Sequence, residues 1–500
     1  MTAQQPRRRP RSEPMSRVDT AWLRMEKPTN PMMITGVLMF AEPMSLERLR
    51  HLVGQRFLAY ARFRQKPVDA PTGAAWQDDA SFDIQWHVQP AALPGRGGKR
   101  ALERFVSRLG SSPLDKDRPL WQFHLVERYR GGSALVARVH HCYADGMALV
   151  QVLLSLTDTV RDPDAGRDLA RDWLKQDGAE VARRVGAVAR YRRLGGKAIA
   201  KGMEMYRDPG LATMLAKEGG EIARELLVAL SLPDDPPSLL RGPLGVSKRV
   251  AWAEPLDLEE VKAVGRACDC TVNDVLMAAA AGALRDYMRE RGEPVDGITL
   301  RATVPVNLRP LEHAKKLGNH FGLVFLDLPV GEPNPVRRLE RVAHCMDRLK
   351  SSKQAIVAYG LLAALGMTPQ PVQEVALALL SRKATAVATN VPGPQQPLYL
   401  AGCTLREMMF WVPQTGSIGI GISILSYNGR VHFGLIADAR LIPDPDAVIR
   451  RFGPEFEKLL YLALMGDWEA ALDAAAAEGL AVDGARAVAT HAGAAPELAG

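Results

Sequence analysis

The sequence has few cysteines, no long apolar run and no apolar segment near its N-terminus, and each of these features argues against a class of protein. The 500 residues include five cysteines, an odd number without zinc-finger spacing, so we expect a reducing compartment and no metal site. The N-terminus is polar and arginine-rich with no apolar core after it, which argues against a secretory signal. The longest apolar stretch, residues 355–367, falls short of the roughly 20 residues that a membrane-spanning helix needs. A buried helix or an interfacial hairpin is expected there instead.

Acidic residues are absent from one long basic segment, residues 181–201, which carries seven lysine and arginine side chains. Apolar residues alternate with these cations, a pattern that favours a basic amphipathic helix on an anionic lipid surface. A solvated helix on an inter-domain connector is the alternative interpretation. No recognised nucleic-acid motif accompanies the charge, so nucleic acid is not expected as a partner. The net charge of +8 fits an anionic partner in general.

The most informative segment is residues 140–146, with the sequence HHCYADG, which follows a β-rich stretch and precedes an apolar one that predicts a helix. A histidine can take up and return a proton near neutral pH, and the end of a strand holds it rigidly. We therefore predict that His141 is a general base for a nucleophilic hydroxyl. A metal site that includes His140 is one alternative, although adjacent strand residues point to opposite faces. The other alternative is a purely structural role, in which both histidines lie in the core with their hydrogen bonds satisfied.

Asp145 is predicted to support this loop. In an extended chain it would lie roughly 13 Å from His141, at about 3.3 Å per residue. That separation is too long for a His–Asp relay. We therefore expect Asp145 to brace the loop, by ion pairing, and not to act on His141.

Further short motifs follow along the chain. They are RPLW at residues 118–121, ND at 273–274, PVNLR at 305–309, GNHFG at 318–322 and NVPGP at 390–394. With HHCYADG and in this order, they resemble the bacterial wax ester synthase/diacylglycerol acyltransferase family, which belongs to the CoA-dependent acyltransferases with a His-His-x-x-x-Asp-Gly motif. The resemblance extends over most of the chain. One departure is that Met33 and Ile34 stand where the family usually has a histidine-valine pair.

The resemblance implies transfer of a long-chain fatty acyl group from acyl-CoA to diacylglycerol or a long-chain fatty alcohol, which forms triacylglycerol or wax ester. His141 would deprotonate the acceptor alcohol, which would attack the thioester carbonyl directly, without an acyl-enzyme. Acyl-CoA is then a substrate, and no cofactor is expected. A related acyltransferase with a different alcohol or amine acceptor is one alternative function. A non-catalytic lipid-droplet surface protein is the other.

The same resemblance implies roles for other motif residues. Asn273 would lie near the active site, where its amide could donate a hydrogen bond to the tetrahedral oxyanion. Alternatively, Asn273 merely caps the following helix, since Thr271 and Asn273 are both good N-caps. The motif residues expected to be structural are His140, Asp145, Gly146, Pro119, Leu120, Trp121 and Asp274. No substrate-binding residue is predicted.

The implied fold is α/β, with two chloramphenicol-acetyltransferase-like domains, each a mixed sheet flanked by helices, and an active-site tunnel between them. The chain length also favours two domains, because it exceeds what one core normally supports. The predicted segments are a disordered N-terminal extension (1–15), an N-terminal acyltransferase domain with the HHxxxDG motif (16–160), a helical connector with the basic segment (161–247), a C-terminal acyltransferase-like domain (248–466) and an alanine- and glycine-rich tail (467–500).

Local patterns predict individual elements within these domains. Strands are expected at residues 33–40, 298–306, 322–328, 384–388, 418–425 and 431–437, and helices at 45–60, 337–349 and 447–464. The Asn-Gly pair in residues 426–429 predicts a hairpin turn. Because the implied substrates and products are lipids, we expect a cytoplasmic enzyme associated peripherally with the inner face of the cell membrane and with lipid droplets.

Overall fold

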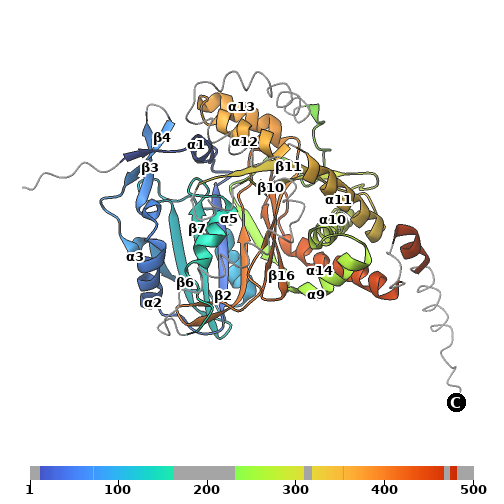
Figure 1. Ribbon diagram of the computed structural model, residues 1–500, viewed down its shortest axis with the longest axis horizontal. Coiled ribbons are helices and arrows are strands. Elements are labelled where there is room, and N and C mark those ends of the chain that lie inside the picture. Colours follow the sequence, from blue (N-terminus) through green and yellow to red (C-terminus); the bar gives the residue numbers. More distant parts are fainter. Residues whose placement is uncertain are drawn as a thin grey trace, which may run out of the picture.

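Two large β-sheets organise the computed structural model, which describes residues 12–70, 73–161, 231–308, 318–352, 354–466 and 473–480. Figure 1 shows the two sheets side by side, with helices α10, α11 and α14 on the outer side of the second. This is the predicted mixed α/β architecture of sheets flanked by helices. The predicted basic segment, residues 181–201, lies outside the described residues.

The first sheet has six strands in the order β13-β14-β2-β7-β6-β5. Its middle strands pair antiparallel, and β2 runs beside β7 along its whole length. The strands are β2 (Met33–Phe40), β5 (Val88–Ala91), β6 (Trp121–Tyr129), β7 (Gly132–His140), β13 (Tyr399–Leu400) and β14 (Cys403–Trp411). Strands β2 and β7 are buried throughout, so this half of the sheet is covered on both faces.

The second sheet runs in the order β11-β10-β12-β15-β16-β8, and β9 pairs with β16. Its strands are β8 (Lys248–Trp252), β9 (Leu256–Asp257), β10 (Leu300–Asn307), β11 (Phe321–Leu328), β12 (Ala386–Pro392), β15 (Ile420–Tyr427) and β16 (Arg430–Asp438). The predicted hairpin turn between β15 and β16 is confirmed. Asn428 and Gly429 both have positive φ angles, of 48° and 72°, as a tight hairpin of this type requires.

Strand β14 is the main difference from the predicted domain division. It comes from the segment assigned to the C-terminal domain, yet it pairs antiparallel with β2 of the first sheet. One of its faces, which includes Met408 and Phe410, belongs to the core around the first sheet. Met409 and Trp411 on the other face pack with Trp252 of the second sheet. A boundary at residue 248 therefore does not separate the two sheets.

Helices cover the sheets and connect them. Those beside the first sheet are α2 (Leu46–Leu52), α3 (Ile84–His87) and α5 (Gly146–Leu154). Helix α4 (Lys99–Gly110) contacts both large sheets, and α1 (Arg17–Arg24) packs against α12 and the small third sheet. Those beside the second sheet are α9 (Leu258–Ala267), α10 (Val272–Glu290), α11 (Pro335–Ser351), α12 (Gln354–Leu365), α13 (Gln370–Ser381) and α14 (Pro445–Met465). Helix α14 continues through Pro454. The predicted helix at residues 45–60 is shorter than expected, because α2 ends at Leu52 and a π-helical turn follows.

A small third sheet corrects one expectation about the N-terminus. Ser12–Pro14, assigned from the sequence to a disordered extension, forms strand β1 and pairs with β4 (Gly73–Asp78), which also pairs with β3 (Gln65–Ala70). The ladder provides hydrogen-bond partners for these backbone groups. At the other end, residues 474–480 of the predicted tail are helical.

No single helix among the described residues is long and apolar enough to cross a membrane. The pair α9 and α10 meets the length and composition criteria only when taken together, across a 96° bend. Most of α10 is buried in the core of the second sheet, and a core helix meets the same criteria. The apolar stretch at residues 355–367 forms α12 and the start of a tight connection to α13, which is a helical hairpin.

Candidate active site

The two histidines of the HHCYADG motif have different surroundings. His140 is fully buried, and its Nδ1 accepts a hydrogen bond of 3.1 Å from the amide of Cys142. Burial, with a smaller contribution from His141, lowers the pKa of His140 to about 3. The ring is therefore neutral, and its 3.7 Å approach to Glu26 is not an ion pair at neutral pH. His140 bonds within the loop, and its structural role stays a prediction.

His141 is the first residue after β7 and lines a cavity between the two sheets. Its backbone amide donates to the carbonyl of Met32 at 2.7 Å, and its ring stacks on Trp22 with 4.1 Å between the ring centroids. Burial lowers the pKa of His141 to about 4, which the nearby Asp145 carboxylate only partly opposes. The imidazole is therefore neutral at pH 7 and able to accept a proton. No group of three histidine, cysteine or acidic side chains in the described ranges could hold a metal ion.

Asp145 braces the loop in a way that the sequence analysis did not foresee. It is the N-cap of α5, where its Oδ1 accepts from the amide of Ala148 at 2.8 Å. Its Oδ2 accepts from the amide of His320 at 3.1 Å. One carboxylate thus starts the helix after the HHCYADG loop and binds a loop of the other sheet. The ion pair expected for Asp145 stays a prediction.

Asn319 connects the two halves of the site directly behind His141. Its side-chain Nδ2 lies 2.8 Å from both the backbone carbonyl of His141 and the carboxylate of Asp19, and it donates to both. Asp19 also accepts from the amide of Asn319 at 3.1 Å. Burial raises the pKa of Asp19 to about 6. This link spans three hundred residues of sequence, and no local pattern marks Asp19 as its partner.

The Pro119-Leu120-Trp121 motif holds the loop from another side. The amide of His140 donates to the carbonyl of Leu120 at 2.9 Å, and the amide of Leu120 donates to the phenol oxygen of Tyr143 at 3.0 Å. The Trp121 indole nitrogen donates to a backbone carbonyl at 2.8 Å from its fully buried position. These contacts are consistent with the structural role that we predict for the motif.

Asn273 lies beside the cavity and not in its lining. Its side-chain oxygen accepts from the amide of Asn390 at 2.9 Å, and Asn390 does line the cavity. The alternative in which Asn273 caps the helix is wrong, because Thr271 is the N-cap of α10 and forms a capping box with Asp274. The structure therefore places Asn273 where it orients Asn390.

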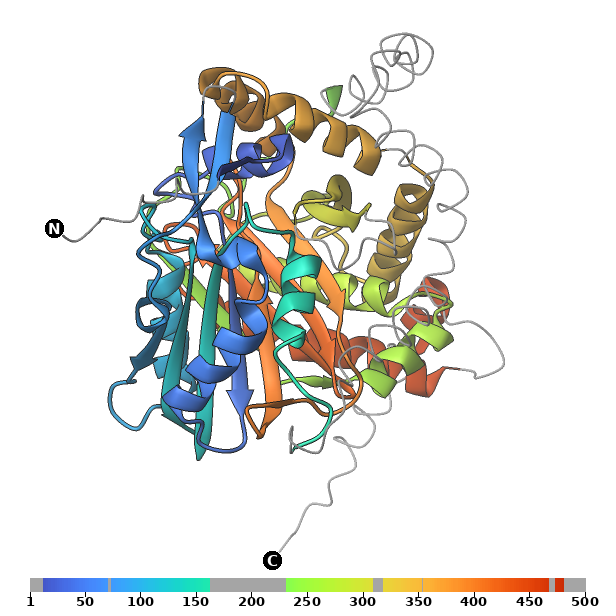
Figure 2. The same ribbon diagram turned by 60° about the vertical axis from the view of Figure 1, so that its left-hand side comes forward.

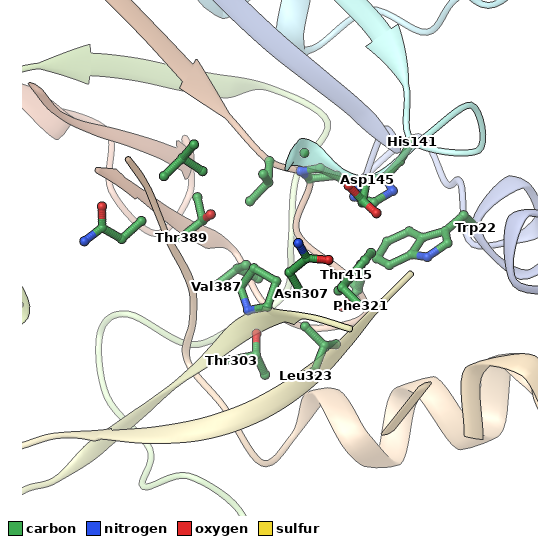
Figure 3. Close-up of a pocket in the computed structure, with 16 residues that line it drawn as sticks. Trp22, His141, Asp145, Thr303, Asn307, Phe321, Leu323, Val387, Thr389 and Thr415 are labelled. Carbon is green, nitrogen blue, oxygen red and sulfur yellow. The ribbon is translucent and has the colours of Figure 1, made fainter. Parts of the chain in front are cut away.

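The cavity brings together side chains from both sheets. Figure 3 shows His141, Asp145 and Trp22 on one side, with Thr303, Asn307 and Leu323 from β10 and β11 and Val387 and Thr389 from β12 opposite them. It holds about 890 Å³ of empty space, its opening included. Gly146, also in the lining, is the first residue of α5. The quoted motifs PVNLR, GNHFG and NVPGP each contribute to the lining, whereas Thr303, Leu323, Val387 and Thr389 lie outside every quoted motif.

A second, almost wholly apolar cavity adjoins the first. Both are lined by Trp22, Thr303, Leu323 and Thr415. The walls of the second come mainly from α12 and α13, with Val357, Ala358, Leu361, Leu362, Leu365, Leu377 and Leu380. A chain of methylene groups could therefore occupy the second cavity while a polar head group lies beside His141.

Comparison with known proteins gives concordant results. Residues 15–276 match the model of the wax ester synthase/diacylglycerol acyltransferase catalytic domain, and residues 317–460 match that of the WS/DGAT C-terminal domain. A Mycobacterium tuberculosis protein named as a probable diacylglycerol O-acyltransferase is 30% identical over 399 residues, which cover 78% of this chain and 81% of that protein. A second protein of that species with a similar name is 28% identical and covers 90% of each chain.

Solved structures share the fold. The wax ester synthase/diacylglycerol acyltransferase from Marinobacter aquaeolei VT8 has a TM-score of 0.64 at 24% identity and covers 90% of this chain and 100% of its own. The first condensation domain of the calcium-dependent antibiotic synthetase has a TM-score of 0.56 at 16% identity and covers 93% and 98%. Both likenesses concern the fold alone.

Proposed function

The chain belongs to the wax ester synthase/diacylglycerol acyltransferase family of O-acyltransferases, and we propose that it transfers a long-chain acyl group from acyl-CoA to diacylglycerol or a long-chain fatty alcohol. The observation that carries this proposal is the neutral, buried imidazole of His141 in a cavity that adjoins a second, almost wholly apolar cavity. A hydrophobic acceptor with one hydroxyl matches that arrangement. The products are triacylglycerol and wax ester.

His141 accepts the proton of the acceptor hydroxyl, and the oxygen forms a bond to the thioester carbonyl carbon. The carbonyl electrons move onto oxygen and give a tetrahedral oxyanion. When this intermediate collapses, the carbon–sulfur bond breaks and the protonated His141 returns its proton to the CoA thiolate. Because the two substrates react directly with each other, both must be bound in the cavity at the same time. This mechanism uses acyl-CoA as a substrate and no further cofactor.

The oxyanion needs a hydrogen-bond donor held in place before the reaction. Asn390 is our candidate, because its amide lies in the cavity wall and is already oriented by Asn273. An Asn390 amide has two N–H groups, of which one binds Asn273. The predicted contribution of Asn273 to the oxyanion then becomes indirect, through the position of Asn390.

We also propose that the enzyme is cytoplasmic and contacts the inner face of the cell membrane or lipid droplets peripherally. The lipid nature of the proposed acceptor supports this, because a diacylglycerol is not available in bulk water. The basic segment at residues 181–201 supports it from the sequence. Replacing the five arginines of that segment by glutamine would test whether the segment binds the membrane. Equal pelleting of the parent and the variant with vesicles at low salt would contradict that role.

The decisive experiment identifies the products. Purified protein is incubated with palmitoyl-CoA and either diacylglycerol or hexadecanol, with the His141→Ala variant as the matched control, and the lipids are separated by mass. Triacylglycerol or wax ester that forms with the parent and not with the variant supports the proposal. Formation of neither ester, or faster transfer to an amine than to either alcohol, would overturn it.

A further inference from the structure

Helix α13 carries an apolar face toward solvent. Met367, in the connection before α13, and Val372, Val375 and Leu379 on α13, which together we call the α13 face, have between 45% and 69% of their surfaces exposed. They are four of the ten large hydrophobic side chains that are exposed among the described residues, and they fall within thirteen positions. Val372, Val375 and Leu379 follow the helical spacing that places side chains on one side. Single exposed apolar residues need no explanation, whereas a row of them is a candidate interaction surface. The row on α13 differs from the exposed residues near the end of α14 because α13 also lines the apolar cavity, whereas α14 lines neither of the two cavities.

The opposite side of the same helix lines the interior. Leu377 and Leu380 of α13 line the apolar cavity, together with Leu361 of α12. That cavity shares Trp22 with the cavity of His141. The α12–α13 hairpin, at the margin of the molecule in both Figure 1 and Figure 2, therefore separates the outside from an apolar route to the catalytic base.

Charged groups form a mixed rim around the α13 face. Arg24 of α1 donates to the carbonyl of Thr368 in the turn between the two helices, at 3.2 Å. Lys27 forms an ion pair of 3.2 Å with Glu374 on α13, and Arg382 directly after α13 pairs with Asp234. These three cations outnumber the two acids at the rim. An apolar centre with a slightly positive rim matches the interface of an anionic lipid layer better than it matches bulk water.

We propose that the α13 face docks the enzyme on a lipid surface that contains its acceptor, and that the acceptor's chains pass beneath the α12–α13 hairpin into the apolar cavity. This inference rests on the proposed function, because only a lipid acceptor must be taken from such a surface. The main attraction is apolar, so docking through this face persists at high salt. Attraction through cations alone would be screened.

The test compares two triple variants of the full chain. In the first, Val372, Val375 and Leu379 are replaced by glutamine, which favours helix as well as the residues it replaces. In the matched control, the same change is made at Tyr461, Leu464 and Met465, three half-exposed apolar residues of α14. None of the six lines either cavity. Flotation with phosphatidylcholine vesicles that contain diacylglycerol, at low and high salt, measures binding.

We expect the affinity of the α13 variant for vesicles to fall by at least about tenfold, which corresponds to about 1.4 kcal/mol. The α14 control should bind as the parent does. Transfer to vesicular diacylglycerol falls in parallel. Transfer to a soluble short-chain alcohol and the melting temperature stay unchanged. The single variant Val375→Gln, at the most exposed position of the face, shows the same trend with a smaller loss if the triple variant folds poorly.

Other occupants of the face give other results. Equal vesicle binding by the parent and both α13 variants overturns the proposal. A lower melting temperature with unchanged vesicle binding would mean that another part of this chain covers the face, and a change in oligomeric state would mean that a second copy does. Both outcomes also overturn it. A parent that acylates neither acceptor refutes the proposed function instead, and that result is read from product formation and not from flotation.

Discussion

Replacing His141 by alanine separates the proposed chemistry from the fold. The change removes the only group that we assign to proton transfer, and a general base contributes about 10²–10⁴-fold to a rate. At 1.36 kcal/mol for each factor of ten, the barrier should rise by about 3–5 kcal/mol. The change also removes the stacked contact with Trp22, and such a ring pair is worth about 0.5–1.5 kcal/mol. That loss is small beside the 5–15 kcal/mol by which domains are typically stable.

The neighbouring His140 provides the control. It lies one residue away, is equally buried, and does not line the cavity. His140→Ala leaves the amide of Cys142 without its acceptor, and an unsatisfied buried donor costs about 1–3 kcal/mol. We therefore expect the reverse pattern, with the larger loss of stability at His140 and the larger loss of turnover at His141.

Three measurements distinguish the outcomes: release of CoA thiol under saturating substrates, acyl-CoA binding, and urea unfolding. For His141→Ala we expect turnover to fall at least a hundredfold, with acyl-CoA binding near that of the parent. Near-normal turnover would refute the proposed mechanism. A fall in acyl-CoA affinity as large as the fall in rate would assign His141 to binding and not to proton transfer.

Three further predictions follow from the contacts around the base. Asp145→Asn should lower activity and melting temperature together, because the N-cap of α5 and the bond to the His320 amide weaken; a loss of several orders of magnitude at an unchanged melting temperature would indicate direct catalysis. Asn319→Ala should reduce turnover about tenfold and stability by about 1–3 kcal/mol, since two hydrogen bonds behind His141 are lost, and unchanged unfolding in urea would contradict this link. With a pKa of about 4 for His141, turnover should be constant from neutral pH down to about pH 5 and fall below it, whereas an inflection near 6.5 would contradict the assignment.

The same histidine pKa shifts fix the sign of the stability change in acid. In the unfolded chain a histidine takes up its proton near pH 6.5. In the folded chain burial lowers the pKa to about 4 for His141 and His432 and to about 3 for His140. Their contribution to stability is therefore lost as pH falls from about 6.5 to about 4. Asp19, with its pKa raised to about 6, acts in the opposite direction, because its neutral form suits the buried site. Urea unfolding at pH 7 and pH 5 should show a net decrease at the lower pH.

Local sequence patterns identified most strands of the second sheet and two central strands, β2 and β7, of the first. Each predicted strand exists, and the Asn428-Gly429 turn has the expected backbone angles. Strand β14 was missed because its residues are buried on both faces, so it lacks the alternation by which a half-buried strand is recognised. Its partner β2 also lies more than 360 residues away, and no local signal encodes such a pairing.

The site was predictable only in part, for a similar reason. HHCYADG pointed to His141, and an aspartate-glycine pair before an apolar run is a helix N-cap signature that would have explained Asp145. Likewise Thr271 and Asp274 are spaced as a capping box, which identifies the cap of α10 without Asn273. Trp22 and Asp19 carry no such mark. They belong to a helix near the N-terminus, and only the assembled fold brings them to His141.

The position of the HHCYADG loop therefore depends on both halves of the chain. The His141 amide bonds the carbonyl of Met32, which directly precedes strand β2. Without β14, β2 would be an edge strand, and eight residues of unpaired backbone are a liability that proteins avoid. On the other side, Asp145 and the His141 carbonyl are bonded by His320 and Asn319 from the loop before β11. Neither sheet alone holds the base in position, because contacts from segments beside both sheets surround it. The predicted segments 16–160 and 248–466 are thus two parts of one cooperative site and not a catalytic domain joined to an accessory one.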